Sequence, residues 1–220
     1  MGTLLNRRRY MGGGEDAPLP PGAVRIEYLC ATGTQWIDTG INCLPDYSIE
    51  AVFYYDTSSG HSNRQVPFGQ DIDNGIGVSY NTGGGTPWGC IFGTEVQTTK
   101  KNSAIATRLT NEKFKVTISN KIFSFYKEDG TYIGGAQFDT EPSFSALTMY
   151  LFAFSRSTKI YTGNANVRCY SFVIKDGNGS KVLDFVPVRV EQVGYMYDRV
   201  NGQLFGNSGT GDFILGPDKT

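Results

Sequence analysis

The chain has 220 residues, a formal net charge of −1 and 39% hydrophobic residues. This length and apolar content suit one large β domain that buries its own core. A near-neutral chain whose body has no basic stripe excludes the usual electrostatic footprint of a nucleic-acid binder. Gly is abundant (28 residues) and aromatic residues reach 13%, while only 19% of residues are charged. This composition predicts short strands joined by tight turns and argues against long solvated helices or a coiled coil.

The four cysteines, Cys30, Cys43, Cys90 and Cys169, are too far apart in sequence for a CxxC zinc motif. No apolar run follows the basic residues at the N-terminus, so we expect no secretory signal. No segment approaches the roughly 18 apolar residues of a membrane-spanning helix. We therefore expect reduced cysteines that fill core positions, and one buried cysteine pair remains an alternative.

Residues 1–23 differ from the rest of the chain, because runs of glycine (12–14) and proline (18–21) disfavour regular structure. We predict an N-terminal arm over residues 1–23 and a single domain over residues 24–220. The arm carries its candidate docking side chains close together: Arg7, Arg8, Arg9, Tyr10 and Met11. Such residues could contact an acidic partner, and a merely solvated or docked tail is the favoured interpretation of the arginines.

Strand patterns begin with the short apolar segment at residues 24–29. In residues 48–55, Ile49, Ala51, Phe53 and Tyr55 share one face and Ser48, Glu50, Val52 and Tyr54 the other. Alternation with period two is typical of a half-buried strand. Residues 60–101 are rich in Gly, Asn and Thr, and we expect long loops with short strands there.

Further strands are predicted over residues 113–118, 121–126, 131–133, 149–154, 167–174, 182–188, 195–198, 203–205 and 213–215. Residues Ser119-Asn120 predict a tight hairpin, and Asp129-Gly130 and Asn201-Gly202 are typical of turns, the latter of type I′. Many short strands at this spacing, without an amphipathic helix, predict an all-β sandwich or barrel.

Two stretches carry a resemblance to a known family. Residues 28–41 contain Thr-Gly-Thr-Gln-Trp-Ile-Asp-Thr-Gly, and residues 182–213 contain Asp184-Phe185, Tyr197-Asp198, Asn201-Gly202 and an Asn-Ser-Gly-Thr-Gly-Asp-Phe run. Together they resemble laminin-G-like, concanavalin A-like lectin domains of bacteriophage structural proteins and gut Bacteroidetes. The resemblance covers residues 26–216 and implies a two-sheet antiparallel jelly-roll sandwich.

The resemblance also implies a function. Residues 7–13 look like the starts of phage virion proteins, which favours a non-enzymatic virion structural protein, such as a head or tail fibre or decoration subunit. We then expect a homo-oligomer, assembled in the host cytoplasm, that contacts other virion proteins through the arm and possesses no membrane span. The alternative is a bacterial carbohydrate-binding lectin domain. Cell-surface carbohydrate is an expected ligand in both interpretations.

A glycoside hydrolase is the third and least favoured interpretation. Family relatives of that class carry a Glu-x-Asp-x-x-Glu pattern, because the reaction needs a pair of carboxyl groups. This chain lacks the pattern, and Asp139-Thr140-Glu141 is interpreted as a turn beside Pro142. His61 is the single histidine, which argues against a histidine-dependent triad.

The candidate glycan site lies in the region expected to be rich in loops. Sugar binding uses a flat aromatic ring with amides and carboxylates that fix the hydroxyl groups. Trp88 is the preferred platform, with Tyr80, Asn81, Asp71 and Asp73 as candidate neighbours. The opposing interpretation is that Trp88 plugs the end of the sandwich. Asp71 and Asp73 could also offer oxygens to Ca²⁺, but a polar turn is favoured, and no cofactor is expected.

Overall fold

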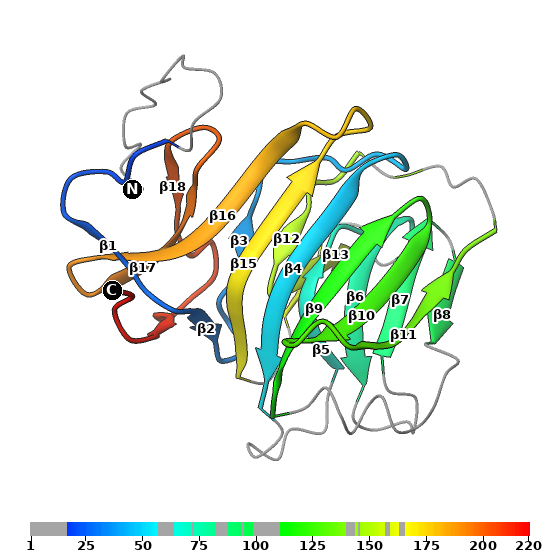
Figure 1. Ribbon diagram of the computed structural model, residues 1–220, viewed down its shortest axis with the longest axis horizontal. Helices are drawn as coiled ribbons and strands as arrows, with labels where there is room; N and C mark the ends of the chain where they lie inside the picture. Colours follow the sequence, from blue (N-terminus) through cyan, green and yellow to red (C-terminus); the bar gives the residue numbers. More distant parts are fainter. Residues whose placement is uncertain are drawn as a thin grey trace.

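Figure 1 shows the computed structural model, which describes residues 17–56, 64–71, 73–81, 88–93, 95–98, 111–139, 144, 146–156, 159–162 and 166–220. The regular elements in these ranges are all β-strands, and they form two facing antiparallel sheets and one small hairpin. The all-β sandwich predicted from the sequence is therefore confirmed. Within the same ranges, no helix is long and apolar enough to cross a membrane.

The larger sheet, here called the front sheet, faces the viewer in Figure 1. Its strands run in the order β11-β10-β9-β4-β15-β16-β17-β18. Their bounds are β11 (Tyr132–Gln137), β10 (Ile122–Lys127), β9 (Lys113–Ser119), β4 (Ser48–Tyr55), β15 (Val167–Lys175), β16 (Lys181–Val190), β17 (Val193–Asp198) and β18 (Gln203–Phe205). Three short strands extend it: β1 (Ala23–Arg25) pairs with β16, and β2 (Leu29–Ala31) pairs with β15 and with β19 (Ile214–Leu215).

The smaller back sheet lies behind β9 and β10 (Figure 1). Its strands are, in order, β3 (Ile37–Asp38), β12 (Tyr150–Leu151), β5 (Arg64–Gly69), β6 (Gly75–Asn81), β7 (Trp88–Gly93) and β8 (Glu95–Thr98). The separate hairpin joins β13 (Ala153–Arg156) to β14 (Lys159–Thr162). The short strands expected within residues 60–101 are present, and this region supplies four of the back-sheet strands.

Aromatic side chains from both sheets meet in the core. Phe53 of β4 stacks on Phe68 of β5 with 5.8 Å between ring centroids, and Phe68 meets Phe172 of β15 edge-on at 5.2 Å. Phe92 of β7 contacts Phe123 of β10 at 6.2 Å. All five rings are at most 1% exposed. Such ring pairs add about 0.5–1.5 kcal/mol each beyond the area that they bury, so they hold the sheets together.

The predicted alternation of β4 is confirmed, and β9 has the same pattern. Ile49, Ala51, Phe53 and Tyr55 of β4 are buried, as are Phe114, Val116 and Ile118 of β9. The intervening residues of these strands lie on the outer face of the sheet. This outer face therefore has polar and aromatic side chains over an entirely apolar inner face.

Strand β15 changes phase at a bulge. Cys169 pairs with Phe53 and Ser171 pairs with Val52, so Tyr170 is an extra residue without a register partner on β4. Val167 and Cys169 are buried before the bulge, and Phe172 and Ile174 are buried after it. A bulge shifts the alternation by one residue. It lets Arg168 and Tyr170 face outward while Phe172 and Ile174 still enter the core.

The two sequence stretches that resemble lectin domains bind each other. The Trp36 N–H and the Gly209 N–H both donate to Asn207 Oδ1, at 3.1 and 2.8 Å. The Gln35 side-chain amide donates to the Asp212 backbone carbonyl at 3.0 Å. The backbone amides of Ser208 and Thr210 donate to the backbone carbonyls of residues 36 and 34, respectively. We call this contact between residues 34–36 and 207–212 the terminal clasp. It brings segments from opposite ends of the sequence together.

Turn geometry follows the sequence at one hairpin and departs from it at another. Asn120 and Lys121, between β9 and β10, have φ angles of 49° and 63°, as a two-residue type I′ turn requires. The type I′ turn predicted at Asn201-Gly202 was wrong. Asp198 pairs with Gln203 across a four-residue loop, in which Gly202 alone has a positive φ, 67°.

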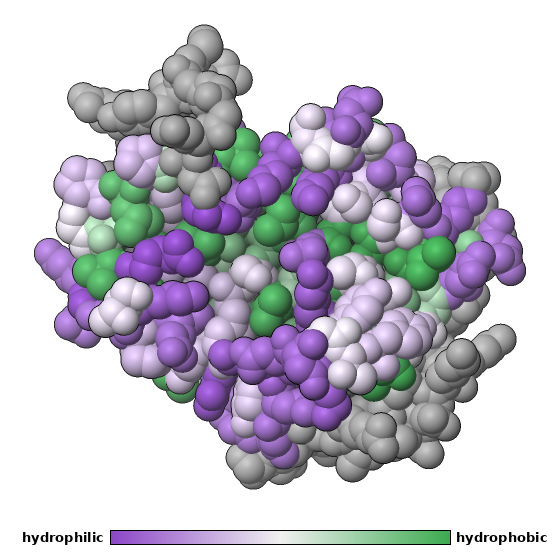
Figure 2. Space-filling view, in the orientation of Figure 1, coloured by the Kyte–Doolittle hydropathy of each residue, from purple (hydrophilic) through white to green (hydrophobic). Residues whose placement is uncertain are grey.

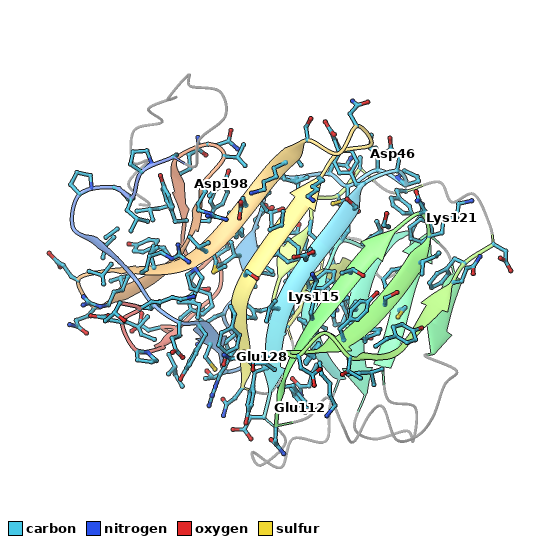
Figure 3. The ribbon with its side chains drawn as sticks, in the orientation of Figure 1. Asp46, Glu112, Lys115, Lys121, Glu128 and Asp198 are labelled. Atoms are coloured by element: carbon cyan, nitrogen blue, oxygen red, sulfur yellow. The ribbon has the colours of Figure 1, made fainter. Side chains whose placement is uncertain are left out.

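The wider loop leaves room for a buried carboxylate. Asp198 Oδ1 accepts from the Asp184 and Val200 amides, both at 3.0 Å, and Oδ2 accepts from the Asn201 side chain at 2.6 Å. Asp184 in turn accepts from both Arg199 Nη2 (2.8 and 3.0 Å) and Lys181 Nζ (2.6 Å). Figure 3 labels Asp198 at the end of β17, beside β16 and β18. The Asp184, Asp198 and Asn201 side chains of the C-terminal stretch therefore have a structural role, as members of one hydrogen-bond network.

The N-terminal boundary differs from the predicted one. The Ala17 amide donates to the Arg199 carbonyl at 2.7 Å, the Tyr197 hydroxyl donates to the Pro18 carbonyl, and Ala17 packs against a small cluster around Tyr197. Ala23 already belongs to β1. Residues 17–23 of the predicted arm therefore lie against the sandwich itself. Arg7, Arg8, Arg9, Tyr10 and Met11 are outside the described residues.

Replacing Asp198 with alanine tests the structural role of this network. Asp198→Ala removes the acceptor of two backbone amides in a site where Asp198 is 0% exposed. Because unsatisfied buried donors are costly, we expect a loss of about 3 kcal/mol in the free energy of unfolding. Urea unfolding measures this as a lower midpoint at an unchanged m-value. The control is Asp212→Ala, an exposed carboxylate, expected within about 0.5 kcal/mol of wild type; equal losses in the two variants would contradict the assignment.

Candidate functional site

The sequence-predicted aromatic pair lies in strands. Trp88 is the first residue of β7 and is the register partner of Tyr80 on β6, while Asn81 ends β6 opposite Arg64. The prediction that these three residues lie in loops was therefore wrong for their backbone. Their side chains are outside the described part of the chain.

The two candidate aspartates lie at the other end of β6. Asp71 and Asp73 precede Gly75, the first residue of β6, whereas Tyr80 stands five positions further on, about 16 Å along an extended strand. The structure therefore does not bring the aspartates together with Tyr80 and Trp88.

The aspartates form the polar turn that the sequence analysis favoured. The Asp73 amide donates to Asp71 Oδ1 at 3.0 Å, and the Asp71 side chain is buried while Asp73 is exposed. In the residues that the structure describes, no three His, Cys, Asp or Glu side chains group as a metal site would need. His61, Thr140 and Glu141 lie outside those residues.

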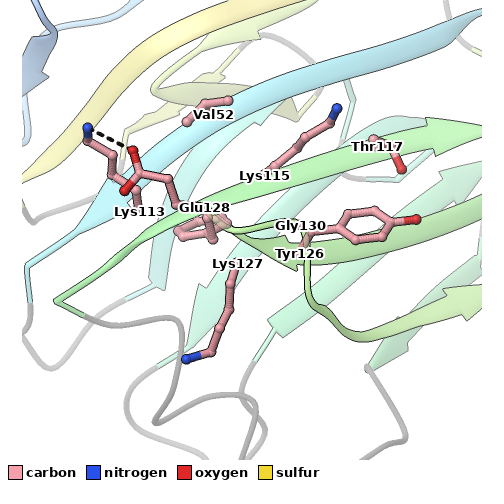
Figure 4. A pocket seen from close by; sticks show the side chains of 9 residues that line it. Val52, Lys113, Lys115, Thr117, Tyr126, Lys127, Glu128 and Gly130 are labelled. Atoms are coloured by element: carbon pink, nitrogen blue, oxygen red, sulfur yellow. Dashed lines mark hydrogen bonds and ion pairs between the residues drawn. The ribbon is translucent and has the colours of Figure 1, made fainter.

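The structure instead places a hollow on the outer face of the front sheet. It has a volume of about 550 Å³ and lies over β4, β9, β10 and the turn that follows β10. Its described lining residues are Val52, Lys113, Phe114, Lys115, Thr117, Tyr126, Lys127, Glu128 and Gly130. We call it the groove; Figure 4 shows its side chains at close range. In the space-filling view, hydrophilic and more apolar residues mix over these strands (Figure 2).

Three ion pairs surround the groove. Lys113 Nζ lies 3.2 Å from Glu128 Oε1, Lys115 Nζ lies 2.8 Å from Glu50 Oε2, and Lys127 Nζ lies 3.4 Å from Glu112 Oε2. Figure 3 shows Lys115, Glu128 and Glu112 along β9 and at its lower end. Each of these side chains is at least a third exposed. Exposed ion pairs contribute at most about 1 kcal/mol, so a ligand can exchange them for its own hydrogen bonds at little cost.

A cluster of tyrosines and cations adjoins the groove. The Arg168 guanidinium carbon lies 4.7 Å from the ring centroid of Tyr28 and 4.6 Å from that of Tyr54. Lys113 Nζ lies 4.6 Å from the ring centroid of Tyr170, which is 5.4 Å from Tyr28. We call these five residues the tyrosine–arginine cluster. Lys113 belongs to both the cluster and the groove, so the two form one continuous surface.

The electrostatics of the cluster reflect this packing. Burial raises the pKa of the Tyr170 phenol, against the opposing hydrogen bond and charge of Arg168. Burial disfavours the charged form of Arg168. The hydrogen bond between Arg168 and Tyr170 and the neighbouring phenols have the opposite effect, and the net result is a raised pKa of Arg168. Arg168 is thus a permanent cation held against aromatic rings, as cation–π contacts within about 6 Å allow.

The cysteines supply no nucleophile. All four are free and buried, so the buried disulfide that the sequence left open is not formed. Burial raises the pKa of Cys30 to about 11 and that of Cys43 to about 12, and it raises the pKa values of Cys90 and Cys169 as well. A thiol reacts through its thiolate, which these values suppress at neutral pH.

Comparisons with known proteins bear on the fold. No protein-family model matches this chain, and no curated protein has a significantly similar sequence. A solved structure described as a "putative carbohydrate binding protein" from Bacteroides ovatus superposes with a TM-score of 0.54 at 11% identity, over 90% of this chain and 61% of that one. This chain thus spans about three fifths of that protein's length. At such identity the likeness supports a shared β-sandwich fold and nothing further.

Two more solved structures match with TM-scores below 0.5 and carry no argument. A mutant Trypanosoma rangeli sialidase displaying trans-sialidase activity gives 0.33 at 13% identity, over 62% of this chain and 21% of that one. The binding domain of botulinum neurotoxin serotype D gives 0.37 at 10% identity, over 89% of this chain and 71% of that one. None of the three descriptions refers to a phage or a laminin, so the expected laminin-G-like and virion relationships stay predictions.

The outer-face residues of the front sheet were not among the candidates predicted from the sequence. The alternation in residues 48–55 placed Tyr54 on the face opposite Phe53, but gave it no functional role. A signal was present, because Tyr54, Tyr126 and Tyr170 are aromatic residues in strands whose apolar faces were already complete. Neither the neighbourhood of these strands in the sheet nor the β15 bulge could be read from the chain.

Thiol reactivity tests the burial of the cysteines. At pH 8 a thiol with a pKa of about 11 has about 100-fold less thiolate than one with the ordinary pKa of 9.0. We expect the folded protein to react with an aromatic disulfide reagent at least about 100-fold more slowly than the unfolded protein, and more slowly at lower pH. Unfolded without reductant, all four thiols should react. A smaller number would reveal a disulfide, and rapid reaction in the fold would contradict the burial.

Proposed function

We propose that this chain is a non-catalytic carbohydrate-binding β-sandwich protein whose sugar lies in the groove on the outer face of the front sheet. The observation that carries the proposal is the groove itself. It combines a tyrosine with lysine, glutamate and threonine side chains over a rigid sheet. Its volume of about 550 Å³ falls within the usual range for small-ligand sites.

The groove has both kinds of group that a sugar requires. Tyr126 and Val52 supply apolar surface for the C–H face of a pyranose ring, while Lys115, Thr117 and Glu128 supply donors and acceptors for hydroxyl groups. Each of these residues projects from a strand or a tight turn. A site on paired strands is held more rigidly than one on loops, which lowers the entropy cost of binding.

The shared fold gives secondary support. The description of the Bacteroides ovatus protein refers to carbohydrate binding. Because the likeness is one of fold, binding is transferred to this chain only as part of the proposal, and the location of the groove rests on this chain's own side chains.

The number of acidic residues in the groove supports a binding role rather than a hydrolytic one. Glycoside hydrolysis needs two carboxyl groups that face each other across the scissile bond. Glu128 is the single carboxylate among the described lining residues, and Lys113 holds it in an ion pair. Such a carboxylate is suited to accepting hydrogen bonds from sugar hydroxyl groups.

The virion role expected from the N-terminal residues stays a prediction, since residues 7–13 lie outside the described part of the chain. A virion protein can also bind sugar, so the two roles are compatible. Because Ala17 contacts the sandwich, a deletion that tests the arm should end at residue 16, and we expect the fold of residues 17–220 to survive it.

Alanine substitution of Tyr126 tests the proposed groove. If a ring of the sugar lies on this side chain, Tyr126→Ala should weaken binding about tenfold, equivalent to about 1.4 kcal/mol. An array of neutral and acidic glycans first identifies a ligand, and calorimetry then measures its dissociation constant for both proteins.

The matched control is Tyr161→Ala, because Tyr161 is a 40% exposed tyrosine on β14, outside the front sheet. It should leave the affinity unchanged. Equal affinity in wild type and Tyr126→Ala, or no glycan bound by the wild type, would overturn the proposal.

A further inference from the structure

We propose that the ligand of this face carries an anionic group, a sugar carboxylate or a sulfate ester, and that Arg168 binds it. This inference rests on the proposed function and specifies its substrate class. The anionic group would sit at the tyrosine–arginine cluster, while the rest of the sugar extends past Lys113 into the groove.

Arg168 differs from other arginines of the fold. Arg189 is paired with Asp218 at 2.6 and 2.7 Å, and Arg199 with Asp184 at 2.8 and 3.0 Å. Arg168 makes no ion pair with a carboxylate of the described residues; its contacts are tyrosines and the thiol of Cys30. A guanidinium can donate two parallel hydrogen bonds to a carboxylate or a sulfate. Arg168 therefore supplies a cation without a carboxylate partner in the described structure.

The position of the guanidinium is fixed before any ligand arrives. Tyr28 and Tyr54 contact it at nearly equal centroid distances, 4.7 and 4.6 Å. Tyr54 belongs to the central strand β4, and the Tyr28 carbonyl accepts from the Gly216 amide at 3.0 Å beside β19. Because the long side chain is already ordered, binding an anion costs little further side-chain entropy.

The cluster leads directly into the groove. Arg168, Tyr54 and Lys113 are register partners on the adjacent strands β15, β4 and β9. Neighbouring strands lie about 4.8 Å apart, so Arg168 and Lys113 start from backbones roughly 10 Å apart, with Tyr54 between them. A sugar acid that binds Arg168 can therefore reach Lys113 and the groove residues with its next ring.

The surrounding glutamates limit how much negative charge a ligand can carry. Glu50, Glu112 and Glu128 all lie near the groove, each beside a lysine. A polyanion would place several charges near these carboxylates, and like charges repel. The face therefore fits a glycan with one anionic group at Arg168 better than a nucleic acid or a densely sulfated chain.

Four probes in matched pairs test the charge preference. A trisaccharide with one terminal glucuronate is compared with its methyl ester, and 3′-sulfolactose with lactose, so the members of each pair differ by a single anionic group. We expect wild type to bind at least one acidic probe tenfold or more tightly than its neutral partner. This preference should weaken with added salt, because salt screens exposed charges. The two pairs distinguish a carboxylate ligand from a sulfate ligand.

Variants then assign the preference to one residue. Arg168→Gln should bring each acidic probe to within about twofold of its neutral partner. Arg168→Lys keeps the charge but loses the planar fork, so it should retain part of the preference. The control Lys175→Gln removes the same charge from the other end of β15 and should leave the preference intact. Thermal unfolding of each variant confirms that it is folded.

The outcomes separate this inference from the proposed function. Equal binding of acidic and neutral probes by wild type, or an unchanged preference in a folded Arg168→Gln variant, overturns the anionic-ligand inference while leaving carbohydrate binding in place. No binding of any glycan by wild type overturns both.

Discussion

The outer face of the front sheet depends on the bulge in β15. If Tyr170 were paired regularly instead of forming a bulge, strict alternation would turn Phe172 and Ile174 to the same side as Arg168. Their burial at 0% exposure requires the change of phase, and hydrophobic burial therefore stabilises the bulge. The same change of phase leaves Arg168 and Tyr170 outside, next to Tyr54. The site is thus a consequence of how the core is filled.

The terminal clasp completes this arrangement from the other side. It joins residues 34–36 to residues 207–212, and the neighbouring strand β2 pairs with β19 on one side and with β15 on the other. Tyr28 immediately precedes β2, so the closure of the chain ends brings this ring to Arg168. Gly209 shows how tight the clasp is, because a Cβ there would lie 1.9 Å from the Thr34 carbonyl oxygen.

Sequence reasoning succeeded where local rules decide the structure. The alternation in β4 identified its buried face, and the two stretches that carry the family resemblance contact each other in the terminal clasp. It failed where tertiary context decides. The loop after Asp198 has four residues because the Asp198 carboxylate accepts a hydrogen bond from the Asp184 backbone amide. Rules based on local turn residues do not predict this contact.

The candidate site shows the same limit. Trp88 was the preferred sugar platform because it lies between proline and glycine in the sequence. The structure places it at the start of β7, where its register partner is Tyr80 of β6. Arg168 was unremarkable in sequence, since its partners Tyr28 and Tyr54 are 140 and 114 positions away by numbering. Strand order and the β15 bulge bring these residues together, and neither was predictable from residue patterns.

A crystal structure of the protein with the glucuronate-terminated trisaccharide and one with 3′-sulfolactose would locate the ligand directly. The account predicts that the carboxylate or sulfate oxygens of at least one of them lie about 2.7–2.9 Å from the Arg168 guanidinium, with sugar density continuing over β9 and β10. Sugar density at the end of the β6–β7 hairpin beside Trp88, or on the back sheet, with the outer face of β4, β9 and β15 empty, would contradict it.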